Sequence, residues 1–119
     1  MADLPPGEER AIGVGLRIAE ADEEERHVIH LRGDLDLGNV DEFMSELCAI
    51  AERVAPSELI LDLSGVEFID SKGVAALAGA ELQARGAGVR SFYLRRPTPA
   101  VERVLSLTSV MEHLPMLKD

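Results

Sequence analysis

Residues 59–63, Leu-Ile-Leu-Asp-Leu, form a nearly continuous apolar run. A run of this kind is typical of a strand that is buried on both faces, as the central strands of helix-covered sheets are. In residues 40–54, before this strand, apolar side chains recur at intervals of three and four, which predicts a helix. The order of helix and buried strand therefore restricts the chain to folds in which helices pack on a sheet.

The residues on either side extend this alternation of strands and helices. Alternating apolar residues over 14–18 and a second apolar stretch over 28–31 predict an antiparallel hairpin, with the acidic residues 22–25 as its turn. Ser64-Gly65 predicts a turn after the central strand, and residues 66–69 are a short apolar stretch that follows it. A strand is also predicted over residues 89–94.

Two further helices are predicted after the central strand. The first is closed by Gly86 and Gly88, and its expected core face consists of Val74, Leu77, Ala78 and Leu82. The second begins with Thr98 as its cap and Pro99 as its first residue, and a short turn carrying Leu114 follows it. Before the central strand, Asn39 and Glu42 have the spacing of a reciprocal capping pair for the helix over 40–54.

These elements predict one α/β domain with a mixed, mostly parallel sheet packed against helices and an opening antiparallel hairpin. At 119 residues the chain is too short for two domains of ordinary size. We expect residues 1–11 to be a flexible lead-in and residues 12–119 to be the domain. Since parallel strands end at the same edge of a sheet, residues 33–36 and residues 70–73 should lie together, and we call these two segments the rim.

The net charge of −10 limits the partners of such a domain. Residues 1–60 contain 15 acids and 5 bases, whereas residues 61–119 contain 7 of each. An acidic surface repels phosphate backbones and anionic lipids, so we expect a protein partner, with no direct binding to nucleic acid or membrane. Five arginines in the second half leave a local basic patch open: Arg85, Arg90, Arg95, Arg96 and Arg103. No apolar run approaches membrane-spanning length and the start lacks a signal-peptide pattern, so a cytoplasmic location is expected.

No metal, cofactor or catalytic residue is predicted. His27 and His30 should point to opposite faces of one strand and so cannot share a metal ion. Cys48 is the single cysteine, and its place in a helical pattern predicts a small buried thiol. The sequence has no phosphate-binding loop, no Gly-x-Ser-x-Gly and no Cys-x-x-Cys.

Three stretches of the sequence resemble one family. They are Gly33-Asp34-Leu35-Asp36, the segment from Leu61 to Gly73 (LDLSGVEFIDSKG), and the segment from Pro97 to Leu105 (PTPAVERVL). Together they resemble the STAS domains, and within these the anti-sigma factor antagonists of bacterial partner-switching systems. The resemblance extends over residues 12–116 and implies the STAS fold.

This resemblance also implies a function and a site. Such an antagonist binds an anti-sigma factor that is itself a serine kinase, and thereby releases a sigma factor. The kinase phosphorylates the serine that matches Ser71 and so switches binding off, while a metal-dependent serine phosphatase resets the switch. Asp36 matches the family's partner-contacting aspartate, and we expect the partner to bind the rim through Asp34, Asp36, Asp70, Ser71, Lys72 and Gly73.

The residues themselves leave other interpretations open. Ser71 would also serve as a plain helix cap and Asp36 as a turn residue. Many family members have a second hydroxyl residue where this chain has Lys72, whose charge could pair with a phosphate or disturb recognition by the kinase. The alternative function is therefore a STAS scaffold, joined to other chains or to a transporter subunit, that does not use Ser71 phosphorylation. A hydrolase with Ser71 as nucleophile is the least favoured reading, because no loop clearly supplies a histidine base.

Overall fold

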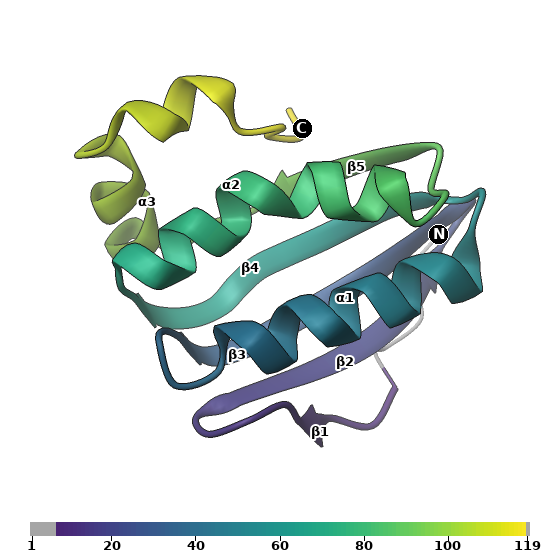
Figure 1. The fold of residues 1–119 in the computed structure, drawn as a ribbon, viewed down its shortest axis with the longest axis horizontal. Coiled ribbons are helices and arrows are strands. Elements are labelled where there is room, and N and C mark those ends of the chain that lie inside the picture. Colours follow the sequence, from purple (N-terminus) through teal and green to yellow (C-terminus); the bar gives the residue numbers. More distant parts are fainter. Residues whose placement is uncertain (1–6, 119) are drawn as a thin grey trace.

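The structure, a computed structural model, describes residues 7–118, and these form a sheet with α1 and α2 side by side across one face (Figure 1). Residues 1–6 and 119 lie outside this description. The strands are β1 Arg10–Ala11, β2 Leu16–Glu23, β3 Arg26–Leu35, β4 Glu58–Ile69 and β5 Ser91–Arg95. The helices are α1 Val40–Val54, α2 Ser71–Gly86, α3 Pro99–Ser106 and the 3-10 helix η1 Ser109–His113.

The strands lie in the sheet in sequence order, from β1 to β5. β2 is antiparallel to both β1 and β3, whereas the β3–β4 and β4–β5 pairs are parallel. The parallel pairs are joined by α1 and α2, which confirms the predicted α/β fold and its opening hairpin. The sequence did not predict β1, because two residues are too few to show a period.

The helix faces agree with the periodicity for α1 and disagree for part of α2. The predicted face of α1 is buried or half-buried against the sheet. In α2 the small residues Ala76, Ala80 and Ala84 are buried with Val74 and Leu77. Leu82, predicted to be in the core, is instead 75% exposed, and Ala78, one turn earlier, is exposed with it. The side chains that let α2 pack closely are alanines, whose hydrophobicity is too low to mark the buried face of the helix in the sequence.

β4 does not turn at Ser64-Gly65, and this part of the prediction was wrong. The strand continues to Ile69, and its pairing with β3 shifts register twice, between His30 and Arg32 and between Gly33 and Asp34. Each shift places an extra β4 residue opposite β3, as a β-bulge does. Gly65 is needed there for space rather than for a turn, because a Cβ at this position would lie 2.5 Å from the carbonyl oxygen of Leu31.

The loops at both ends of β2 also differ from the predicted ones. The charged turn is confined to Glu24 and Glu25, since β2 runs through Glu23. Val14, predicted in the strand, precedes β2 and is 81% exposed. Of the expected lead-in, residues 1–6 lie outside the described residues; within the remainder, the Gly7 N–H donates to the Glu20 carbonyl oxygen, and β1 pairs with β2.

The end of the chain packs as predicted. Thr98 caps α3, where its hydroxyl accepts a hydrogen bond from the Val101 N–H and donates one to the Val66 carbonyl oxygen. Val101, Leu105 and Leu114 are buried in the common core.

Glu20 joins β1, β2, β3 and α1 through charged contacts. Its carboxylate accepts a hydrogen bond from Arg10 at 2.8 Å, lies 2.6 Å from His27 Nε2, and pairs with Arg53 of α1. Burial opposes ionisation of this carboxyl, but the hydrogen bonds from Arg53, His27 and Arg10 outweigh it and lower the pKa of Glu20 to about 2. The folded state therefore favours ionised Glu20.

Replacing Glu20 should make the stability less dependent on acid pH. At pH 7 we expect Glu20→Gln to lower the free energy of unfolding by ~1 to 2 kcal/mol. A carboxyl with a lowered folded-state pKa stabilises the fold above its unfolded value of 4.5, and this contribution is lost as pH falls through about 2. Urea titrations between pH 7 and pH 2 should show the gap between variant and wild type closing across this window. A gap that stays constant would contradict the assignment, and Glu25→Gln, in the exposed turn, is the control.

Candidate functional site

The carboxyl ends of β3 and β4 lie side by side. Leu35 pairs with Ile69, the last residues of the two strands, so Asp36 and Asp70 are the next residues on adjacent strands. The Asp70 N–H donates to the Leu35 carbonyl oxygen at 3.3 Å. The predicted proximity of the two rim segments is therefore confirmed, although residues 33–35 belong to β3 rather than to a loop.

Asp70 links the two rim segments through its side chain. It is the N-cap of α2: its Oδ1 accepts a hydrogen bond from the Gly73 N–H at 2.9 Å. Its Oδ2 accepts a second one from the Leu37 N–H, in the loop after β3, at 3.0 Å. The N–H of Gly73, followed by that of Leu37, lowers the pKa of Asp70, so the carboxylate remains charged and holds both segments.

Ser71 is the first residue of α2 and is exposed. The alternative that it serves as the helix cap is wrong, because Asp70 takes that role. Within the described chain, the Ser71 hydroxyl makes no hydrogen bond to another group. The hydroxyl is thus accessible at the positive end of the α2 dipole, where a negative group is favoured.

Lys72 and Gly73 complete the start of α2. Lys72 is exposed and forms no ion pair with any residue that the structure describes. Gly73 is buried, and a Cβ there would lie 2.3 Å from the Leu35 carbonyl oxygen and 2.6 Å from Cγ1 of Ile69. The absence of a side chain at Gly73 allows α2 to start directly against the end of β3.

Asp36 and Asn39 shape the loop between β3 and α1. Asp36 is a turn residue, since its Oδ1 accepts a hydrogen bond from the Gly38 N–H. Asn39 is fully buried and makes no side-chain cap, so the predicted capping pair with Glu42 is wrong. Its amide nitrogen donates to the carbonyl oxygens of Val14 and Asp34, and its oxygen accepts from the Asp36 N–H. Asn39 thus links the loop before β2 to the end of β3 and the loop after it. The local sequence around Asn39 does not predict these contacts.

Asp34 is separated from the other predicted site residues. Its neighbour Leu35 is buried in the core beneath the helices, so by strand alternation Asp34 points to the opposite face of the sheet. Its carboxylate lies over Gly15 in the loop before β2, where an added Cβ would be 3.9 Å from Oδ2. The structure therefore gathers Asp36, Asp70, Ser71, Lys72 and Gly73, and leaves Asp34 on the other face.

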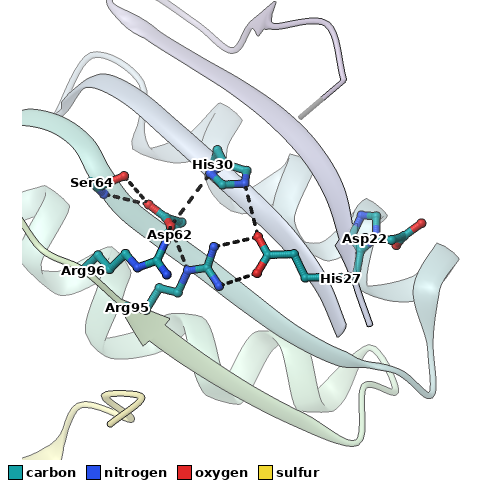
Figure 2. A network of polar contacts seen from close by, with 8 residues as sticks. Asp22, His27, His30, Asp62, Ser64, Arg95 and Arg96 are labelled. Atoms are coloured by element: carbon teal, nitrogen blue, oxygen red, sulfur yellow. Dashed lines mark hydrogen bonds and ion pairs between the residues drawn. The ribbon is translucent and has the colours of Figure 1, made fainter. Parts of the chain in front are cut away.

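A second polar cluster, which the sequence did not predict, extends across β2, β3, β4 and β5 (Figure 2). Asp62 is 1% exposed and accepts hydrogen bonds from Arg95 Nε and from the backbone and hydroxyl of Ser64. Arg95, 3% exposed, also donates two 2.8 Å hydrogen bonds to Glu23. Arg95 does not contribute to the basic patch that the sequence left possible, because its charge is buried and paired with Asp62 and Glu23. Burial raises the pKa of Asp62, but the bonds from Ser64 and Arg95 hold it below its ordinary value.

The side chains of His27, His30 and Cys48 contact other side chains of the fold. His27 contacts Glu20 and Asp22, whereas His30 lies 3.9 Å from Glu23 and from Asp62, so the two rings do face opposite sides of β3. Among residues 7–118, no group of three or more metal-ligating side chains is found. Cys48 is half-buried rather than buried, with its Sγ 3.8 Å from Oε1 of Gln83. None of the helices between residues 7 and 118 has the length and hydrophobicity of a membrane-spanning segment.

Comparison with known proteins identifies relatives over nearly the whole chain. Residues 18–118 match a family model described as "Mlab, STAS domain". An anti-sigma factor antagonist from Mycobacterium paratuberculosis is similar in structure, with a TM-score of 0.70 and 24% identity over 87% of this chain and 86% of that chain. An anti-sigma-factor antagonist (STAS) domain protein from Planctomyces limnophilus gives a TM-score of 0.64 and 26% identity over 85% and 91%. The murine anion transporter Slc26a9 gives 0.64 and 27%, over 77% of this chain and 15% of that chain.

A side chain at Gly73 should separate α2 from β3. We expect Gly73→Ala to lower the free energy of unfolding by ~1 to 3 kcal/mol, because backbone must move to relieve the contact with Leu35. Gly79→Ala in the same helix is the matched control: a Cβ there meets nothing within 4 Å, and alanine should stabilise the helix by ~0.5 to 1 kcal/mol. Urea denaturation measures both, and changes of the same sign would contradict the packing described.

Removing the Asp70 carboxylate should loosen both rim segments. We expect Asp70→Ala to cost ~1 kcal/mol of stability through the lost cap. Hydrogen exchange should become faster at the amides of Leu37 and Gly73, which donate to this carboxylate. Asp41→Ala, an exposed acid in the first turn of α1, should leave both amides unchanged. Unaltered exchange at Leu37 in Asp70→Ala would show that the link is not present in solution.

Proposed function

Because this chain belongs to the STAS domain family, we propose that it is an anti-sigma factor antagonist whose binding is switched off by phosphorylation of Ser71. The unmodified protein binds an anti-sigma factor of the serine kinase type and thereby releases a sigma factor. The observation that carries the proposal is the exposed Ser71 hydroxyl at the start of α2, free of the capping role that Asp70 performs. The similarity to the antagonist from Planctomyces limnophilus supports the same function.

In this proposal the partner covers the rim around Asp36 and Ser71. Phosphorylation adds about −1.5 to −2 charges at a place where the complex had buried a neutral hydroxyl. The charged Asp70 directly precedes Ser71. Among the described residues, no cation contacts this position, and Lys72 would have to move to pair with the phosphate. Burying such a charge without a partner cation costs several kcal/mol, and about 1.4 kcal/mol corresponds to a tenfold change in affinity. The phosphorylated protein therefore dissociates from its partner.

Lys72 is compatible with a phosphate on Ser71. Its ammonium group is exposed and not engaged by another described residue, so it is free to approach the phosphate. An ion pair on the antagonist's own surface would stabilise the modified state without giving the kinase a contact. Lys72 thus supports the phosphorylated form in this proposal.

The protein acts here as a ligand and substrate of enzymes rather than as an enzyme. A metal-dependent serine phosphatase removes the phosphate and restores binding. The reactions take place in the cytoplasm, where a kinase, its ATP and a sigma factor are together. No step requires a cofactor held by this chain.

The second candidate is a STAS scaffold that does not use Ser71. The similarity to the murine anion transporter, in which the matched part is 15% of the chain, favours it because there the fold is one part of a larger protein. Such a scaffold would bind its partner whether or not Ser71 carries charge. The two candidates therefore differ in the effect of charge at position 71.

A capture experiment with three baits separates the candidates. Wild type and Ser71→Ala should both retain an anti-sigma kinase from a native lysate, identified by mass spectrometry. Ser71→Asp should capture at least tenfold less of this kinase. Purified captured kinase with ATP should phosphorylate wild type and not Ser71→Ala. Ser45→Asp, which adds the same charge at an exposed position of α1, should bind as wild type does. Equal capture of one partner by all baits would instead favour the scaffold.

A further inference from the structure

Leu37 is an exposed apolar residue in the loop that is hydrogen-bonded to the start of α2. Its side chain is 69% exposed at the tip of the loop formed by residues 36–39. Single exposed leucines are common on protein surfaces, and Leu82 and Leu107 are exposed to a similar or greater degree. What distinguishes Leu37 is its position, because its backbone N–H is bonded to Asp70, the residue directly before Ser71.

The loop that carries Leu37 is fixed at each of its residues. Asp36 accepts backbone hydrogen bonds from Asn39 and Val40, and its side chain accepts one from Gly38. The Leu37 N–H is held by Asp70 at 3.0 Å, and Asn39 is fully buried with its amide group bonded on both sides. Because this backbone is already fixed, binding through Leu37 would cost the rotamer freedom of its side chain but little backbone freedom.

The charged residues next to Leu37 in the sequence are acidic, and so is the residue that binds its N–H. Asp36 precedes it, and Asp41 and Glu42 are exposed in the first turn of α1. Asp70 is bonded to it, and Lys72 is the nearby cation of α2. A surface that complements this one is apolar at its centre and basic around it.

We propose that Leu37 is the apolar anchor of the interface with the anti-sigma kinase, inserted into an apolar pocket that lies next to the kinase's Ser71-binding site and is flanked by basic residues. This inference rests on the proposed function and adds the chemistry by which the partner recognises the unmodified protein. It also explains why a phosphate disrupts the complex: Leu37 and Ser71 share the dehydrated centre, whereas Asp36, Asp41 and Glu42 remain at the solvated edge.

The test compares two exposed leucines against one partner. Purified kinase from the capture experiment is titrated with wild type, Leu37→Ala, Leu37→Asp and Leu82→Ala by calorimetry. We expect Leu37→Ala to weaken binding ~10- to 100-fold and Leu37→Asp to weaken it further. Leu82→Ala should stay within about twofold, since Leu82 is equally exposed but lies three turns along α2 from Ser71. The rate of Ser71 phosphorylation at low substrate concentration should fall in parallel with affinity.

Thermal unfolding of each variant controls for folding, and because both leucines are exposed, neither alanine variant should change the melting temperature appreciably. If Ser71→Asp abolishes binding while Leu37→Ala and Leu82→Ala bind equally well, the anchor is refuted and the proposed function stands. If wild type binds no such kinase, or Ser71→Asp binds normally, the proposed function fails and the anchor fails with it.

Discussion

The parallel pairing of β3 with β4 is the contact on which the rest of this structure depends. It aligns Leu35 with Ile69, so the residues that follow both strands emerge at one edge of the sheet. Gly73 lets α2 begin against the end of β3, and the Asp70 carboxylate then joins the start of that helix to the loop after β3. A surface that includes Leu37 and Asp70, 33 positions apart in the chain, is thereby held as one unit.

The division of labour between Asp70 and Ser71 follows from this arrangement. A helix start needs an acceptor for its free N–H groups, and the carboxylate of Asp70 supplies it. The neighbouring Ser71 is exposed, and its hydroxyl is not needed to cap the helix. Asp70 caps the helix and Ser71 keeps a free hydroxyl. The phosphorylation proposed for Ser71 would therefore leave the cap of α2 in place.

The two faces of the sheet are stabilised in different ways. α1 and α2 cover one face and bury the apolar core (Figure 1). Asp62 of β4 and Arg95 of β5 are buried and paired, and Glu23 of β2 completes the network (Figure 2). Removing one member of such a network would leave its partner's charge buried and uncompensated, so the pairing of Asp62, Arg95 and Glu23 links β2, β4 and β5.

The sequence alone determined the order of strands and helices, the proximity of the rim segments and the α3 cap, because apolar period and local turn chemistry are properties of neighbouring residues. Its errors arose where long-range contacts decide. Ser64-Gly65 reads locally as a turn, but pairing with β3 keeps it in a bulged strand. Asn39 reads as a cap, but its burial against Val14 and Asp34 gives it other partners. The cap at Asp70 is local, since its carboxylate binds the Gly73 N–H three residues on, and the preference of aspartate for this position could have predicted it. Only the tertiary structure could turn Asp34 to the opposite face and pair Asp62 with Arg95, since these depend on segments that meet only in the folded chain.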